Sequence, residues 1–312
     1  MTQVLNDLPQ SINKLVIIPD KYLSSFPFEI LNFNDKLLIN RFAISYSNSL
    51  SILENQRNMN PNGQPFSFSG FAPHYQKNID TTDSQIYAQL VRSGQWELPF
   101  ALEEVNYISE LFRGEKYINE LATKSNFFEA LKNSKIVHLS MHAEADNENP
   151  MNSKFIFDTE NEDDEKNLLL YELYNLQANS NLVVLSACET GKGIFHNGDG
   201  VRSLGNGFLY AGVPSVVMSL WKVPDESTSK IMVNFYKHLK KGVTKSEALR
   251  KAKLDYLDNV IAPELGHPYY WAGFIISGND DPIDLKSSWN FKTILLLSIF
   301  CLFLLLFFRQ RM

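Results

Sequence analysis

Four short stretches of this chain are almost wholly apolar and have the length of a strand, and this feature restricts the fold most strongly. They are Leu15–Ile18, Ile136–Leu139, Leu182–Leu185 and Ser215–Met218. A strand with one wet face alternates between apolar and polar residues, whereas continuous apolarity is typical of parallel strands covered on both faces. Phe274–Ile276 is expected to be a last strand of the same sheet.

Amphipathic segments lie between these runs and are expected to form helices. One follows Pro224 and carries an apolar stripe at helical spacing. The stripe is Ile231, Met232, Phe235, Tyr236 and Leu239. The next helix is expected to begin at Thr244, with Glu247 completing a capping box, and another to span residues 102–112. Strands that alternate with helices predict an α/β fold, in which a mostly parallel sheet is flanked by helices.

Two stretches are expected to be loops. Residues 55–99 combine turn residues with scattered aromatic side chains, and residues 144–166 are strongly acidic. An acidic loop is most often simply solvated, and the alternative is an acidic rim that attracts a basic part of a substrate.

Charge and cysteine content exclude several classes of function. The 312 residues include 29 Lys and Arg against 35 Asp and Glu, a formal net charge of −6, which argues against nucleic acid as a direct partner. Cys188 and Cys301 lie far apart in unrelated contexts, so we expect no disulfide framework and a reducing compartment. No pair of ligand-type residues has zinc-finger spacing, and no structural metal is expected.

The C-terminal end differs from the rest of the chain. Ile294–Phe308 carries no charge, and counting from Trp289 gives a segment of about 30 Å as a helix, enough to cross a bilayer. We expect a domain over residues 1–278, a linker over 279–288, a single transmembrane helix over 289–309 and a tail over 310–312; the alternative is a buried core helix. The polar start of the chain lacks the features of a secretion signal, so the main domain is expected to be cytoplasmic.

Reactive side chains follow two of the apolar runs. Residues 136–139 lead to His142, and residues 182–185 lead to Cys188. If these runs are neighbouring parallel strands, both side chains leave the same edge of the sheet, where an imidazole could activate a thiol. The simpler alternatives are a small buried cysteine and a structural histidine. His138, inside an apolar run, is expected to be a core histidine.

Further motifs resemble the CHAT domain, a caspase-like domain of the clan of cysteine peptidases that includes separase. The resemblance spans roughly residues 11–278, with a catalytic core over about 115–278. Its motifs are Ile18–Asp20, Phe26–Leu31, Glu103–Val105, Ala122–Lys124, Asp199–Gly200, Ala211–Val217, Ser219–Asp225 and His267–Phe274.

The resemblance implies a caspase-like three-layer sandwich and an endopeptidase that uses a His/Cys dyad without metal or cofactor. The family's histidine falls on His142 and its nucleophile on Cys188. The backbone N–H groups of Ala143 and Cys188 would form the oxyanion hole. The family usually has glycine where this chain has Ala143; alanine keeps the N–H group if the local backbone suits a Cβ atom.

Three residues are candidates for substrate binding. Asp199, between two glycines, could recognise a basic residue or only stabilise a turn. Trp221 and Asp225 could line a cleft, although Trp221 could simply pack and Asp225 could be an N-cap.

The expected function is cleavage of a protein substrate by a membrane-tethered CHAT peptidase, in bacterial defence or regulated cell death by family analogy. The alternative is a catalytically silent, membrane-tethered scaffold. Family members commonly carry N-terminal repeats that sense a trigger, so a partner, or residues upstream of Met1, is expected to supply the sensor.

Overall fold

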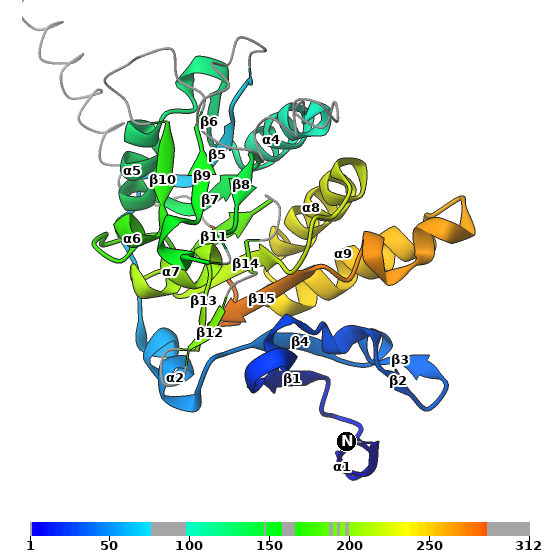
Figure 1. Ribbon diagram of the computed structural model, residues 1–312. Coiled ribbons are helices and arrows are strands. Elements are labelled where there is room, and N and C mark those ends of the chain that lie inside the picture. The colour runs from blue at the N-terminus through cyan, green and yellow to red at the C-terminus, as the bar shows by residue number, and fades with distance from the viewer. Residues whose placement is uncertain are drawn as a thin grey trace, which may run out of the picture.

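An eight-stranded sheet forms the centre of the computed structural model (Figure 1). The structure describes residues 2–75, 98–146, 148–157, 166–186, 190–191, 194–196 and 200–285. In spatial order the strands are β1 (Lys14–Ile17), β4 (Ala43–Tyr46), β15 (Phe274–Gly278), β14 (Ser215–Ser219), β11 (Leu182–Leu185), β7 (Ser134–Leu139), β5 (Phe66–Ala72) and β6 (Glu115–Ile118).

The sheet is parallel except where β15 meets β14. Every residue of β4, β11, β14 and β15 is buried, as expected for strands covered on both faces. The apolar runs therefore predicted β1, β7, β11 and β14 correctly. The last predicted strand is confirmed as β15, which runs against its neighbour β14.

Helices cover both faces of the sheet and complete three layers (Figure 1). One face carries α4 (Pro99–Phe112), α8 (Asp225–Leu239) and α9 (Lys245–Asp258), which pack on Ile136, Val184 and Val217. The other carries α5 (Lys124–Asn133), α6 (Leu170–Leu173) and α7 (Leu204–Tyr210), which pack on Val137, Leu139, Val183 and Leu185. Further elements are α1 (Thr2–Asn6), α2 (Leu50–Asn58), β2 (Asn32–Phe33), β3 (Lys36–Leu37), β8 (Ala143–Glu144), β9 (Lys154–Ile156), β10 (Asn167–Leu169), β12 (Ile194–His196) and β13 (Gly200–Arg202).

The helix predictions are confirmed, but one predicted cap is wrong. The whole apolar stripe of α8 is buried. The N-terminal helix of the three also exists, as α4. At the start of α9, however, the Thr244 side chain accepts no capping hydrogen bond. The Ser246 N–H donates instead to Asp280 Oδ1 at 2.6 Å, and Glu247 pairs with Arg250 at 3.2 Å. A carboxylate from after β15 therefore takes the place of the local capping box.

Both predicted loops contain regular structure. The stretch 55–99 includes the end of α2 and all of β5, and the stretch 144–166 includes β9. Gly70 in β5 shows how closely α4 packs on this strand, because a Cβ atom there would lie 2.9 Å from Val105 Cγ1. Residues 76–97 of the first stretch, and residues 147 and 158–165 of the second, lie outside the described residues.

A buried ion pair joins α9 to the segment that precedes β4. Lys253 Nζ lies 3.1 Å from Glu29 Oε1, and Tyr46 Oη donates to Glu29 Oε2 at 2.7 Å. Burial, and then the Glu29 charge, raise the pKa of Tyr46 well above its usual value. This cluster fixes α9 to the segment that precedes β4.

The surroundings of His138 confirm that it is a core histidine. His138 Nε2 lies 2.7 Å from Glu104 Oε1 on α4, and both side chains are fully buried. The angles between these two groups do not suit a hydrogen bond. Tyr236 Oη lies 3.1 Å from His138 Nδ1, and burial raises the pKa of Tyr236 well above its usual value, helped by the Glu104 charge.

Within the described ranges, no helix combines the length and the apolar character needed to cross a bilayer. The predicted anchor, residues 289–309, lies outside those ranges.

Candidate active site

The two strands that lead to the predicted dyad are neighbours in the sheet. β7 and β11 are parallel and hydrogen-bonded, with Leu139 opposite Leu185. His142 and Cys188 each follow the last residue of their strand by three positions, so both chain segments leave the same edge, which we call the carboxyl edge. Cys188 itself lies outside the described residues.

The residues on either side of that gap are held at the carboxyl edge. The Ser186 N–H donates to the Leu139 carbonyl at 2.9 Å. Beyond the gap, the Ser219 N–H at the end of β14 donates to Thr190 Oγ1 at 3.1 Å, and the Gly191 N–H donates to the Ser219 carbonyl at 2.8 Å. The described residues that flank the gap are thus attached to β7 on one side and to β14 on the other.

His142 is buried, and Tyr75 holds its backbone. The His142 N–H donates to Tyr75 Oη at 2.9 Å, and Tyr75 Oη donates to the Ile156 carbonyl at 2.9 Å. The Ile156 N–H returns a bond to the His142 carbonyl at 3.0 Å. The Tyr75 hydroxyl therefore stands where a direct hydrogen bond of the ladder would run. Its ring also lies 4.7 Å from the imidazole between centroids, so one side chain contacts both parts of His142.

The pairing of His142 with Ile156 determines the direction of the neighbouring Ala143 N–H group. Hydrogen-bonded and non-hydrogen-bonded pairs alternate along an antiparallel ladder. Because His142 and Ile156 form a hydrogen-bonded pair, bridged on one side by Tyr75, the next pair, Ala143 and Phe155, is not hydrogen-bonded. The Ala143 N–H points away from β9. Ala143 also has a negative φ, so its Cβ atom causes no backbone strain.

Tyr75 is the residue that sequence reasoning missed. It lies just past β5, in a stretch expected to be a loop, and no local pattern distinguishes it from the other aromatic residues there. Only the pairing of β5 with β7 brings it to His142.

A hollow of about 190 Å³ adjoins Tyr75 at the same edge of the sheet. We call it the Tyr75 hollow. It is lined by Ala72, Pro73, His74, Tyr75, Leu98, Pro99, Ala101, Leu102 and Asn119. Most of these side chains are apolar, and the volume suits one large apolar side chain.

The three substrate-binding candidates differ in their surroundings. Asp199 lies outside the described residues. Trp221 follows β14, packs against the core and donates from Nε1 to the Tyr269 carbonyl at 2.9 Å.

Asp225 is the first residue of α8, whose N-cap is Pro224, so the N-cap alternative for this residue is wrong. Asp225 Oδ2 accepts the Phe100 N–H at 3.0 Å and so caps α4 instead. Burial raises the pKa of Asp225; the Phe100 hydrogen bond opposes this and the Glu104 charge adds to it.

In the described part of the chain, no group of three His, Cys, Asp or Glu side chains could hold a metal ion.

A sequence profile of the CHAT domain matches residues 1–279. The chain belongs to the CHAT family. Among curated relatives, tetratricopeptide repeat protein 28 of Mus musculus is 28% identical over 223 residues, an alignment that covers 61% of this CHAT chain and 9% of the relative. The Homo sapiens protein of the same name is 29% identical over 223 residues, with the same coverage. The CHAT chain therefore spans only a small part of these relatives.

Two solved structures of cysteine proteinases have a fold similar to that of this chain. The complex of the pro- and mature domains of RgpB from Porphyromonas gingivalis matches with a TM-score of 0.57 at 11% identity, covering 90% of this chain and 67% of that one. The crystal structure of the Arg-specific cysteine proteinase gingipain R matches with a TM-score of 0.55 at 10% identity, covering 90% and 66%. The CHAT chain has the fold of caspase-like cysteine peptidases.

Proposed function

We propose that this CHAT protein is a cysteine endopeptidase in which His142 and Cys188 form the dyad. One observation carries the proposal: β7 and β11 are hydrogen-bonded parallel neighbours, and each candidate follows its strand by three residues. Cys188 is two residues from Ser186 and two from Thr190, so its Cα atom is within about 7 Å of each of theirs. Both of those residues are tied to strands at the carboxyl edge.

The chemistry follows from these positions. His142 accepts the Cys188 proton, and the thiolate attacks the scissile carbonyl carbon. The negative charge that develops on the carbonyl oxygen is stabilised by the N–H groups of Ala143 and Cys188; the former points away from β9 and is not used by the ladder. The peptide C–N bond then breaks, and the amine leaves with the proton held by His142. Water, deprotonated by His142, hydrolyses the thioester and restores the thiol.

The substrate is proposed to be a protein with a basic residue before the cut, recognised by Asp199. Trp221 and the Tyr75 hollow would accept neighbouring apolar side chains. Gingipain R is described as Arg-specific, which makes arginine the first residue to test at that position. Cleavage rates of substrates with Arg, Leu or Asp before the cut would show which residue is preferred at that position. Asp199→Asn should slow cleavage after arginine and leave cleavage after the other residues unchanged.

We also propose that residues 289–309 anchor the protein in a membrane, with the peptidase domain on the cytoplasmic side. A regulatory partner, or repeats on a longer chain, would control the site in a defence or cell-death response. Membrane fractionation of the full chain, compared with a chain that ends before Trp289, tests the anchor. Recovery of both forms in the soluble fraction would contradict it.

The dyad is tested by the rate at which an electrophilic thiol probe labels Cys188 at pH 7, located by mass spectrometry. A thiol of ordinary pKa is about 3% ionised at that pH, so a preformed dyad should label about thirtyfold faster than a His142→Ala variant. His238→Ala is the matched control, because this histidine pairs with Asp255 on the helical layer.

Labelling that is slow and indifferent to His142 would refute the preformed dyad and favour the scaffold. Release of a peptide product by the wild type, absent from Cys188→Ala, would establish the endopeptidase.

A further inference from the structure

A second pocket lies at the opposite edge of the sheet, where β7, β11 and β14 begin. Its volume is about 500 Å³, within the range of small-molecule sites. We call it the amino-edge pocket. Its lining includes Arg57, Gln64, Lys135, Lys245, Asp281 and Asp284. The proposed peptidase uses none of these residues.

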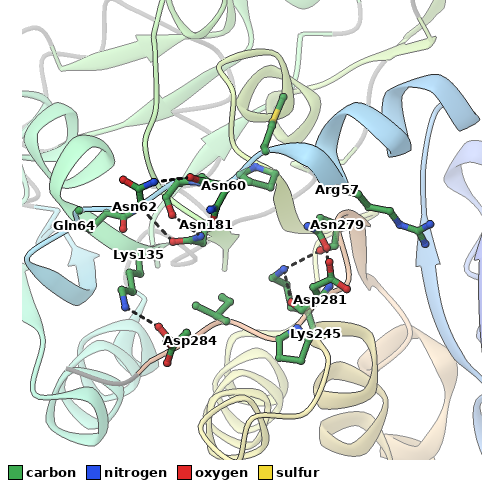
Figure 2. A pocket seen from close by; sticks show the side chains of 16 residues that line it. Arg57, Asn60, Asn62, Gln64, Lys135, Asn181, Lys245, Asn279, Asp281 and Asp284 are labelled. Atoms are coloured by element: carbon green, nitrogen blue, oxygen red, sulfur yellow. Dashed lines mark hydrogen bonds between the residues drawn. The ribbon is translucent and has the colours of Figure 1, made fainter. Parts of the chain in front are cut away.

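Two lysines line this pocket, and both ammonium groups point to the segment that follows β15 (Figure 2). Lys135, at the start of β7, donates from Nζ to the Asp284 carbonyl at 2.7 Å. Lys245, at the start of α9, donates to the carbonyls of Asn279 and Asp281 at 2.9 and 2.7 Å. An ammonium group has three N–H donors, so one remains on Lys245 and two remain on Lys135.

Neither ammonium group forms an ion pair with a carboxylate of the described residues; each bonds backbone carbonyls only. Lys245 is 3% exposed, and burial lowers its pKa to about 8 although the charges of Asp280 and Asp281 oppose this shift. Burying this cation is unfavourable, the nearby carboxylates of Asp280 and Asp281 offset part of that cost, and a bound anion would offset more of it. Arg57 adds a third cation, so three cationic residues line the pocket together with the two acidic residues Asp281 and Asp284.

The wall also contains an acceptor without a donor. Gln64 is 3% exposed. Its Nε2 group donates to the Asn179 carbonyl and to Asn181 Oδ1, whereas its Oε1 atom accepts no hydrogen bond from the described residues. A ligand hydroxyl or amino group that reached this amide oxygen would supply the missing donor. The lining of the pocket therefore favours an anion that also carries a hydrogen-bond donor.

We propose that the amino-edge pocket binds a small organic phosphate that carries hydroxyl groups. The phosphate lies between Lys135 and Lys245, and a hydroxyl group donates to Gln64. A phosphate monoester carries close to two negative charges at neutral pH, which suits two lysines in one pocket better than a single carboxylate does.

Binding should depend on pH through Lys245, which must be protonated to hold the anion. The charged groups around it are Asp280 and Asp281 on the turn after β15, Lys14 on β1 beside Asp280, Arg57 on α2, and Lys135 and Asp284 in the same lining. The phosphate is fully ionised above about pH 7.5. Loss of the Lys245 proton should therefore weaken binding about tenfold between about pH 7.5 and about pH 9.

The test is calorimetric titration of the full chain with glycerol 3-phosphate, with glycerol and citrate as the neutral and carboxylate comparisons. We expect saturable binding with a Kd of about 1 mM or tighter, weakened at least about tenfold in Lys135→Gln through loss of a charge-assisted bond. Lys132→Gln, on the nearby surface of α5 and paired with Glu129 at 3.3 Å, is the matched control and should bind normally. Lys245 also holds the turn after β15, so its substitution could disturb the fold. Its role is therefore tested by the pH dependence of binding rather than by a variant.

Two sources could supply such a phosphate, and detergent micelles doped with phosphatidic acid separate them. Competition between the micelles and glycerol 3-phosphate assigns the site to a lipid headgroup, and its absence assigns the site to a free metabolite. Equal binding of citrate, indifference to Lys135→Gln or a flat pH profile would overturn the proposal. Each readout is independent of peptidase activity.

Discussion

Replacing Tyr75 by phenylalanine removes one oxygen atom from the candidate active site and tests its architecture. The hydroxyl group bridges the His142 N–H and the Ile156 carbonyl, each at 2.9 Å, and Tyr75 is 6% exposed. Phenylalanine keeps the ring beside the imidazole but leaves two buried backbone groups without their partner. At about 1–2 kcal/mol for each group, the free energy of unfolding should fall by about 3 kcal/mol. For a domain of this size, Tm should fall by about 6–12 °C.

The same substitution should slow the chemistry, because His142 loses one of the two bonds that fix its backbone. We expect probe labelling of Cys188 at neutral pH to fall about tenfold, since small displacements of a catalytic base are costly. The measurements are thermal unfolding and the labelling rate on the same preparation. Glycine in place of tyrosine would also delete the ring and is not an equivalent change.

Tyr117→Phe is the matched control, because Tyr117 stacks on Phe71 at 4.7 Å between centroids and its hydroxyl makes no hydrogen bond with the described residues. This control should change stability by less than about 0.5 kcal/mol. A Tyr75→Phe protein with unchanged Tm and unchanged labelling would show that the hydroxyl does not bridge His142 to β9, and the direction assigned to the Ala143 N–H would lose its basis.

Three other substitutions test separate parts of the argument. Asp225→Asn keeps an acceptor for the Phe100 N–H. Because burial raises the pKa of Asp225, its negative charge opposes folding above that pKa, so the variant should have the same or a higher Tm at pH 7, and the difference should vanish as the pH falls below about 4. Asp225→Ala, which loses the acceptor, should be less stable than the wild type at both pH values. Lys253→Met leaves the buried Glu29 without its cationic partner, and should lower the free energy of unfolding by about 3–5 kcal/mol in denaturant titration; a loss below about 1 kcal/mol would contradict a buried ion pair. Ala143→Gly keeps the N–H group, so kcat/KM should stay within about threefold while stability falls by about 0.5–1 kcal/mol; a large gain in activity would show that the Cβ atom strains the oxyanion hole.

The sequence predicted β7, β11, β14 and β15 because burial on both faces leaves a strong local signal, but it missed β4, which is also buried at every residue. Leu182–Leu185 is apolar at every position, and its bounds as β11 match the run. β5 was missed because Ser67, Ser69 and Gly70 interrupt its apolar residues. Those small residues are required by packing: Ser69 Oγ bonds Ser134 Oγ at 2.7 Å, and α4 lies directly on Gly70. A tertiary contact chose residues that local propensity does not associate with a buried strand.

The candidate site was predictable only in part, for a related reason. His142 and Cys188 stand out as reactive types after apolar runs, but their adjacency depends on the order of strands in the sheet, which no local pattern specifies. Tyr75 depends on that order as well. Asp225 shows the converse: a carboxylate at the start of a helix predicts a cap, and it does cap a helix, but α4 is 125 positions away from it in the chain.

The exit of the chain has a geometric consequence for access to substrate. Lys135 and Lys245 hold residues 279–284 at the amino edge of the sheet, whereas His142 lies beyond the other end of β7. Six strand residues span about 20 Å. If residues 289–309 enter a bilayer as proposed, the short linker keeps the amino edge near the lipid surface and turns the carboxyl edge outward. Such a peptidase would cut loops or partner proteins that reach well above the headgroups and would spare peptide bonds next to a transmembrane segment.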